Sequence, residues 1–205
     1  MTGRLKLHRR AVVKALLKDA TDDLLVIGGL GQCAWDITDA GDRPQHLPLW
    51  GGMGGTVMMG LGLALAQPAK RVLVITGDGD MLMGIGSLAT AAAQRPTNLA
   101  IVVLDNEKFG ETGNQATHTA SPGLGPTDRG AGTDLAIIAR GSGIADCGTV
   151  TEEDQIPDLV RAARTVTGPV FRLVKVMVET LPLVMPPKDG AYLKDRMRQA
   201  ILGYV

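Results

Sequence analysis

The chain has 205 residues, of which 45% are hydrophobic and 20% are charged, and its formal net charge is +0. This composition excludes a disordered chain and predicts a single domain over residues 1–205. We expect no nucleic-acid partner, because the chain has no strong positive charge, and no membrane span, because proline and glycine interrupt its longest uncharged stretch, residues 47–66.

Apolar runs alternate with helix-like segments along the chain. The strand-like runs are residues 24–28, 46–50, 72–76, 99–105, 144–150 and 170–176. The helix-like segments are residues 5–17, 32–39, 53–66, 81–94, 134–140, 152–166 and a carboxyl-terminal helix at about 188–203. Strands that are apolar on both faces and alternate with helices are typical of parallel sheets. The sequence therefore predicts an α/β protein with three layers, α/β/α, and a mainly parallel central sheet.

Several side chains outside these runs bear on the setting of the protein. Cys33 and Cys147 belong to no Cys-x-x-Cys or Cys/His cluster. We therefore expect two buried structural thiols in a reduced, cytoplasmic protein without a signal sequence. The basic residues between positions 4 and 10 are expected to form a solvated helix face. Methionine is abundant and aromatic residues are few, so some apolar surface is expected to contact another subunit.

Glycine-rich loops follow the first three strand-like runs. They are Gly28 to Gln32, Gly51 to Gly55 and Gly77 to Asp80, and the fourth run ends at Asp105-Asn106. Ligands of open parallel sheets bind beyond the carboxyl ends of the strands, where such loops gather. We therefore expect the functional site at this edge of the sheet.

The third loop places two carboxylates, Asp78 and Asp80, where a glycine turn usually holds phosphate. The spacing does not fit a dinucleotide-binding fingerprint, because its third glycine would fall at Leu82, and no Gly-Lys-Ser/Thr follows. A divalent cation such as Mg²⁺ resolves the conflict, since it binds carboxylate and phosphate oxygens together. The helix expected to begin near Met81 would offer its amino-terminal end to the anion. For Asp80 a helix amino-cap is favoured over a metal role.

Asn106 lies at the end of the next strand along the chain. Its amide oxygen is a second candidate ligand for the cation that Asp78 would bind. The alternatives are that Asn106 is an ordinary turn residue and that Asp78 sits in a turn without a ligand. A Mg²⁺-dependent phosphotransferase that uses Asp78 and Asp80 as an aspartate pair is also open.

The Gly77-Asp78-Gly79 turn followed by Asn106 resembles the signature of thiamine diphosphate-dependent enzymes, in which an Asn follows a Gly-Asp-Gly turn by roughly 25 to 30 residues. The Gly51 to Gly55 loop is similar to the same family. Residues 81–115 resemble the beta subunit of sulfopyruvate decarboxylases and the corresponding domain of phosphonopyruvate decarboxylases. Asp80 and Asp105 depart from the family pattern and make this region more negative.

The resemblance implies a thiamine diphosphate-binding fold, with Asp78, Asn106 and the Lys108 carbonyl as ligands of Mg²⁺. The Gly51 carbonyl would accept from the aminopyrimidine of the cofactor, and Met53 would be the apolar wedge that bends it. The other cofactor contacts that the resemblance implies are at Gly31, Gln32, Gly77, Gly79, Asp80, Phe109 and Gly110.

Residues near the mouth of the implied site are candidates for contact with the substrate. Glu111 and His118 are catalytic candidates together with Met53, and Lys108 or Arg129 could meet an anionic tail. Polarity of a surface loop explains Glu111 and His118 about as well.

The function that the resemblance implies is decarboxylation of a 2-oxo acid to CO₂ and an aldehyde, with thiamine diphosphate and Mg²⁺ as cofactors. The chain would be the cofactor-binding subunit of a heteromer, because the activating glutamate of the family comes from a separate pyrimidine-binding (alpha) subunit. Self-association is also expected. The alternatives are the beta subunit of a 2-oxo acid:ferredoxin oxidoreductase, against which the missing cysteine cluster counts, and a non-catalytic module that binds the cofactor.

Overall fold

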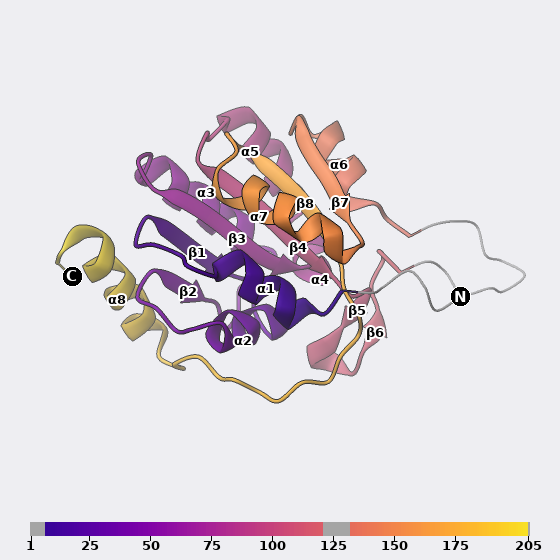
Figure 1. The fold of residues 1–205 in the computed structure, drawn as a ribbon, viewed down its shortest axis with the longest axis horizontal. Helices are drawn as coiled ribbons and strands as arrows, with labels where there is room; N and C mark the ends of the chain where they lie inside the picture. The colour runs from indigo at the N-terminus through magenta and orange to yellow at the C-terminus, as the bar shows by residue number, and fades with distance from the viewer. Residues whose placement is uncertain (1–6, 121–131, 205) are drawn as a thin grey trace, which may run out of the picture.

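The computed structural model describes residues 7–120 and 132–204. Its centre is a sheet of six parallel strands in the order β2-β1-β3-β4-β8-β7 (Figure 1). The strands are β1 (Leu24–Gly28), β2 (His46–Pro48), β3 (Arg71–Gly77), β4 (Leu99–Asp105), β7 (Asp146–Val150) and β8 (Val170–Lys175). All six strands that the apolar runs predicted are present, and the prediction of a parallel sheet is confirmed.

Helices cover both faces of the sheet, which confirms the three layers (Figure 1). One face carries α1 (Arg9–Leu17), α2 (Gln32–Asp39) and α7 (Ile156–Arg164). The other carries α3 (Thr56–Ala66), α4 (Asp78–Met83), α5 (Ser87–Gln94) and α6 (Leu135–Gly141). The last helix, α8 (Gly190–Leu202), packs on the edge strand β2 and lies within the range predicted for it.

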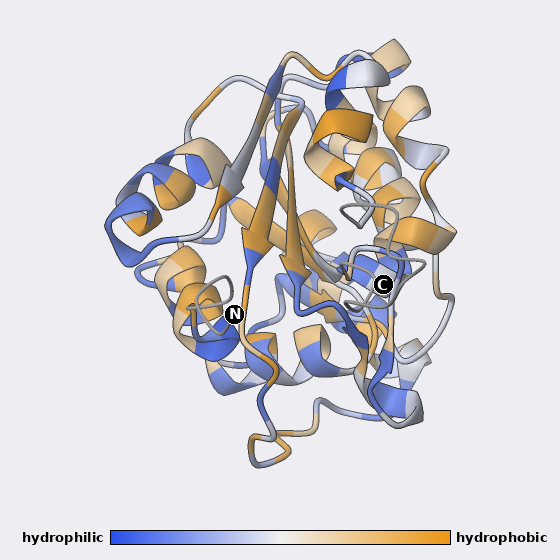
Figure 2. Cartoon of the chain, turned by 90° about the vertical axis from the view of Figure 1, so that its right-hand side faces the viewer, coloured by the Kyte–Doolittle hydropathy of each residue, from blue (hydrophilic) through white to orange (hydrophobic). Residues whose placement is uncertain are grey.

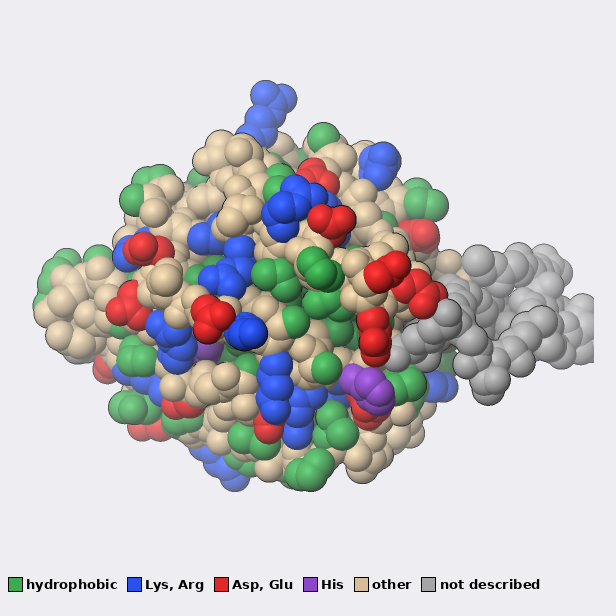
Figure 3. Space-filling view, viewed as in Figure 1, with side chains coloured by type: hydrophobic (Ala, Val, Ile, Leu, Met, Phe, Trp, Pro, Cys, Tyr) green, Lys and Arg blue, Asp and Glu red, His purple; other side chains and the backbone are tan. Residues whose placement is uncertain are grey.

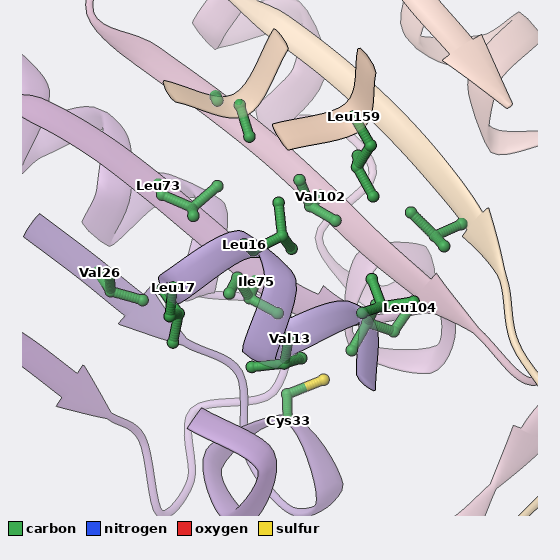
Figure 4. Close-up of a cluster of buried hydrophobic side chains, with 14 of the residues drawn as sticks. Val13, Leu16, Leu17, Val26, Cys33, Leu73, Ile75, Val102, Leu104 and Leu159 are labelled. Carbon is green, nitrogen blue, oxygen red and sulfur yellow. The ribbon is translucent and has the colours of Figure 1, made fainter. Parts of the chain in front are cut away.

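The core consists of two layers of buried apolar side chains, one on each face of the sheet. Successive strand residues alternate between them: Leu73 packs in the layer under α1 and α7, whereas Val72 and Val74 pack under α3. Figure 2 shows the strands as the most hydrophobic part of the chain, and Figure 4 shows Leu16, Leu73 and other side chains of the first layer. Each fully buried aliphatic side chain contributes roughly 1.5 to 3 kcal/mol, so both layers stabilise the sheet.

The order of the strands locates the place where a ligand can bind. The chain passes from β1 to β2 on one side and then returns to β3 on the other side of β1. The loops that follow β1 and β3 therefore separate at their carboxyl ends, and such a switch point leaves a crevice for ligands. The loop after β1 is held beside β3, because Gly29 N donates to Ile75 O at 2.8 Å.

Two predicted helices have other boundaries in the structure. The helix predicted at 53–66 begins only at Thr56, because Gly52 and Gly54 have positive φ of 73° and 90°, which a helix does not admit. The helix predicted at 81–94 is two helices, α4 and α5, separated at Gly84 to Gly86. Helix α4 begins at Asp78, so both carboxylates of the glycine loop lie in its first turn.

The ends of two further helices differ from the pattern in the sequence. Leu7 forms a parallel bridge with Val176, and α1 therefore begins at Arg9, whereas the prediction began at residue 5. The segment predicted at 152–166 starts as the 3-10 turn η2 (Glu153–Gln155) before α7. The short hairpin of β5 (Lys108–Phe109) and β6 (Gln115–Ala116), with η1 (Gly110–Thr112) between them, was not predicted.

The prediction of a solvated basic face is wrong for Arg9 and Arg10, whereas Arg4 and Lys6 lie outside the described residues. Arg9 is 2% exposed, and Arg9 and Arg10 both bind the carboxylate of Asp36 on α2. Figure 3 shows mixed positive and negative side chains on the face that α1 and α7 cover. Cys33 and Cys147 are free and buried, as predicted. Within the described residues no helix combines the length and apolar character that a membrane crossing needs.

Candidate functional site

A cavity of about 160 Å³ opens at the switch point of the sheet. The predicted site residues that line it are Gln32, Met53, Gly77, Asp78, Asp80, Asn106, Lys108, Phe109, Gly110 and Glu111. The structure therefore brings together the glycine loops after β1 and β3 and the turn after β4.

Asp78 is more buried than Asp80, the other carboxylate of the glycine loop, and only 2% of its surface is exposed. Its Oδ2 accepts hydrogen bonds from the hydroxyls of Thr117 and Thr119, which follow β6. No other side chain of the described residues donates to this carboxylate. Burial, followed by the nearby charge of Asp105, raises the pKa of Asp78 from 3.8 to about 6. A cation at Oδ1 would compensate for both causes.

Asn106 forms the turn between β4 and β5. Its Oδ1 accepts from Lys108 N at 3.0 Å, and its Nδ2 donates to Gln32 Oε1 at 3.2 Å. The second contact joins the turn to the start of α2. Glu107, between the two candidate ligands, has a left-handed φ of 63°. The turn is thus fixed with the Asn106 amide at the cavity.

The candidate metal ligands at the cavity are oxygen atoms, which hard cations prefer. Asp78 and Asn106 lie at the ends of the neighbouring strands β3 and β4, and the Lys108 carbonyl is in the same turn. In the parts of the chain that the structure describes, no three His, Cys, Asp or Glu side chains are grouped so that they could hold a metal. A cation here would therefore complete its coordination with oxygens of a bound ligand and water, as Mg²⁺ commonly does.

The prediction that Asp80 is a helix amino-cap is wrong. The amino-cap position of α4 is Gly77, and Asp80 is the third residue of the helix. Its carboxylate accepts from Thr56 Oγ1 at 2.5 Å, from Thr76 Oγ1 and from Gly54 N. Asp80 thereby joins the end of β3, the second glycine loop and the start of α3. With its oxygens engaged in this way, it is a poor member of the aspartate pair that a phosphotransferase would need.

Gly79 lies under two side chains of the cavity wall. A Cβ atom at Gly79 would stand 2.5 Å from Phe109 Cε1 and 3.3 Å from Met53 Cε. The first distance is well below van der Waals contact, so the ring and the loop fit together only with glycine here. Met53 is also half-buried beside the loop, where the predicted wedge would have to be.

The helices that start at the cavity have free first turns. Among the described residues, no side chain caps α2, whose amino-cap is Gly31 with a φ of 70°, or α4. Backbone N–H groups at a helix start bind anions, and the helix dipole assists. The Glu111 side chain lies over Gly31, with Oε1 2.8 Å from where a Cβ would be. Burial raises the pKa of Glu111.

Three predicted residues lie outside this arrangement. Gly51 and His118 are exposed, and neither lines the cavity. Arg129 lies outside the described residues. The roles of Gly51 and His118, like those of the other predicted site residues, stay predictions.

Four residues of the site were not predicted from the sequence. Arg9 lines the cavity, and Thr117, Thr119 and Lys175 are buried behind the turn after β4. The alternation Thr117-His118-Thr119 is a signal for the threonines, because residues two apart in an extended chain point to the same side. Lys175 ends an apolar strand, and nothing in the neighbouring sequence indicates that this lysine belongs to the site.

Known proteins resemble this chain in sequence and in structure. It is 44% identical over 118 residues to the sulfopyruvate decarboxylase subunit beta of Methanothermobacter thermautotrophicus, covering 58% of this chain and 63% of that protein. It is 34% identical over 161 residues to the phosphonopyruvate decarboxylase of Streptomyces viridochromogenes, covering 78% of this chain and 38% of that protein. The structure matches benzoylformate decarboxylase from Polynucleobacter necessarius with a TM-score of 0.68 and 20% identity, covering 86% of this chain and 34% of that one. Identity this low supports the fold alone.

The family match includes the residues that line the cavity except Arg9 and Val176. The chain spans less than two thirds of the length of each of these three proteins. Residues 27–174 match the family described as thiamine pyrophosphate enzyme, C-terminal TPP binding domain. This range runs from β1 to β8, and the chain therefore belongs to the thiamine pyrophosphate enzymes.

Proposed function

We propose that this chain binds thiamine diphosphate with Mg²⁺ and is the cofactor-binding subunit of a heteromeric 2-oxo acid decarboxylase that releases CO₂ and an aldehyde. The observation that carries the proposal is the pairing of Asp78 and Asn106 on neighbouring strands, beside the uncapped starts of α2 and α4. This arrangement offers oxygen ligands to a cation and backbone N–H groups to a diphosphate.

Different residues of the cavity would hold different parts of the cofactor. Asp78, Asn106 and the Lys108 carbonyl would hold Mg²⁺, and the loops around Gly31, Gly77 and Gly79 would hold the diphosphate. Met53 and Phe109, which meet over Gly79, would press on the apolar part of the cofactor and exclude water. When bound, thiamine diphosphate supplies the electron sink that decarboxylation of a 2-oxo acid needs. Glu111 at the cavity and His118 remain candidates for contact with the substrate.

The related proteins support the choice of substrate and of partner. Their names specify sulfopyruvate and phosphonopyruvate, which are 2-oxo acids with an anionic tail, and one of them is called subunit beta. We therefore propose a substrate of this class and a separate pyrimidine-binding subunit that supplies the activating glutamate. A cytoplasmic location and self-association of the complex belong to the same proposal.

Reconstitution tests the function directly. The chain, coexpressed with the protein that co-purifies with it, is expected to release CO₂ from sulfopyruvate or phosphonopyruvate when thiamine diphosphate and Mg²⁺ are present. Omitting either cofactor is the control and should abolish release. Calorimetry should show binding of thiamine diphosphate but not of ATP. If the cofactor binds and no 2-oxo acid in a broad panel loses CO₂, the chain is a binding module and not an enzyme subunit.

The outer face of α3 is where we expect the partner to dock. Met58, Met59 and Leu65 are 44%, 43% and 49% exposed, and Met83 at the end of α4 is 64% exposed. Helix α3 carries no charged residue, so both its inner and its outer face are apolar. Apolar surface of this kind marks an interface. Its neighbour, the loop of Gly54, borders the cavity, so a partner docked here would reach the cofactor.

Introducing negative charge on this face tests the docking surface. The double substitution Met58→Glu, Met59→Glu is expected to abolish co-purification of the partner, because two carboxylates would be buried in the interface. The unfolding midpoint of the isolated chain should change little, since both side chains are exposed. Ile137→Glu on α6, where Ile137 is 68% exposed, is the matched control and should keep the partner. Retention of the partner by the double variant would exclude this surface.

A further inference from the structure

Lys175 is a buried cation directly behind the turn that holds the candidate metal ligands. It is the last residue of β8, is 5% exposed, and lies opposite Asp105 in the register of β4 and β8. Its Nζ lies 2.7 Å from Asp105 Oδ2 and 2.8 Å from Glu107 Oε1. One ammonium group thus binds the residues on both sides of Asn106.

Close polar contacts connect Lys175 to Asp78, and they meet at the Thr119 hydroxyl, whose one proton can be donated to either carboxylate. Asp105 is fully buried, and its Oδ1 accepts from Glu107 N at 3.1 Å and lies 2.8 Å from Thr119 Oγ1. The same hydroxyl lies 3.0 Å from Asp78 Oδ2. The hydroxyl of Thr119 therefore stands between two carboxylates from neighbouring strands. The position of the Asp78 carboxylate depends on where Asp105 and Lys175 hold that hydroxyl.

The second contact of Lys175 acts on the backbone of the turn. Glu107 lies between Asn106 and Lys108, and its left-handed φ of 63° is a conformation that is unfavourable for a residue other than glycine. The ion pair with Lys175 holds the Glu107 side chain and compensates for that cost. The direction of the Lys108 carbonyl follows from the same backbone conformation.

Charge in this region makes Lys175 necessary in this chain. Asp78, Asp105 and Glu107 gather within one hydrogen-bonded network, and Lys175 is the cation that the described ion pairs place in it. Without the ammonium, Asp105 would be a buried carboxylate without its counter-charge, and such a group repels its neighbours strongly. Asp105 and Lys175 therefore act as a matched pair.

We propose that Lys175 is a positioning residue for the metal site: with Asp105 and Glu107 it fixes the turn 105–108 and, through Thr119, the carboxylate of Asp78. The proposal rests on the proposed function, because the ligands that it positions are those of the Mg²⁺ site. Lys175 itself touches neither the cation nor the cofactor.

The affinity for Mn²⁺, used in place of Mg²⁺ with thiamine diphosphate present, is the measurement that tests this role. The free ion is counted by electron paramagnetic resonance, so no turnover is needed. Lys175→Met is expected to weaken Mn²⁺ binding about 10-fold, the lower end of the effect of losing a direct partner of a metal ligand, because Lys175 acts on the ligands through Asp105 and Glu107. Lys175→Arg should keep most of the affinity, because a guanidinium can reach both carboxylates. Lys188→Met, at an exposed lysine outside the network, should bind as the wild type does.

A double substitution separates positioning from simple stabilisation. Asp105→Asn with Lys175→Met removes the unpaired charge, so the free energy of unfolding should recover toward the wild-type value. The Glu107 contact stays broken, and we expect Mn²⁺ affinity to remain several-fold weaker. Wild-type affinity in the Lys175→Met chain, or in a stably folded double variant, overturns the proposal. If the wild-type chain itself binds no Mn²⁺ with the cofactor, the proposed function fails as well.

Discussion

Replacing Asp78 with Asn is expected to abolish Mg²⁺-dependent binding of thiamine diphosphate while making the metal-free protein more stable at neutral pH. The amide keeps the shape of the side chain and can still accept from Thr117 and Thr119, but it offers no negative oxygen to the cation. We expect the affinity for the cofactor at saturating Mg²⁺ to fall by about 100-fold or more, since a metal ligand is lost and not only its partner. Calorimetric titration of the variant with the cofactor measures this.

The gain in stability follows from the raised pKa of Asp78. Its folded-state pKa of about 6 lies above the ordinary value of 3.8, because the carboxylate is buried and faces Asp105. A raised pKa means that the folded state holds the proton more tightly, so the free energy of unfolding falls as the pH rises from about 4 to about 6. Well above pH 6, where the carboxyl is fully ionised, the full penalty is present, on the order of 3 kcal/mol.

Urea unfolding of the metal-free chain at several pH values checks the sign. The difference in unfolding free energy between Asp78→Asn and the wild type should be near zero at pH 4 and reach its plateau above pH 6. Asp22→Asn, at a side chain that is 77% exposed, is the control and should show no such pH dependence. A variant that takes up the cofactor at wild-type affinity would contradict the assignment of Asp78 as a cation ligand.

The strands could be predicted closely because their signal is local. Residues 24–28 and 99–105 are continuous apolar runs rich in Leu, Ile and Val, and β1 and β4 have these same bounds. Helix bounds were less accurate where glycine decides the backbone. The positive φ values of Gly52 and Gly54 shorten α3, and the glycines at 84 and 86 separate α4 from α5, which periodicity alone does not reveal.

The part of the site that consists of loops could also be predicted from the sequence. Asp78 and Asn106 were recognised because glycine loops and polar residues at strand ends meet at one edge of a parallel sheet. The side chains that support the site could not be predicted from the sequence, since their partners are distant in the chain. Lys175 meets Asp105 across 70 positions, and Arg9 meets Asp36 across 27. Such pairs arise only when the sheet order places their elements side by side.

Replacing Asp80 with Ala is expected to cost the largest amount of stability of any single change at the site. The carboxylate is 7% exposed and is the common acceptor for Thr56 Oγ1, Thr76 Oγ1 and Gly54 N. Truncation leaves these three donors without an acceptor in a dry interior, and each unsatisfied group costs roughly 1 to 3 kcal/mol. We expect a loss of about 3 to 5 kcal/mol in the free energy of unfolding, measured with urea.

Two further variants show that the lost acceptor is the cause. Asp80→Asn keeps one acceptor oxygen, and the threonine hydroxyls can turn to accept from its amide, so its cost should be about 1 kcal/mol. Asp158→Ala, at a side chain that is 79% exposed, controls for removal of an aspartate and should change the free energy of unfolding by less than about 0.5 kcal/mol.

A double-mutant cycle with Thr76 isolates the contact itself. Thr76→Val alone should destabilise the chain by about 1 to 2 kcal/mol, because Asp80 loses a donor. In the Asp80→Ala background the same change should cost almost nothing, since the hydroxyl then has no acceptor to lose, and the difference is the coupling energy of the pair. Equal costs in both backgrounds would show that Asp80 does not hold the end of β3 in place. Strong coupling would mean that the extra aspartate of this glycine loop joins β3, the second glycine loop and α3 into one rigid wall of the cavity.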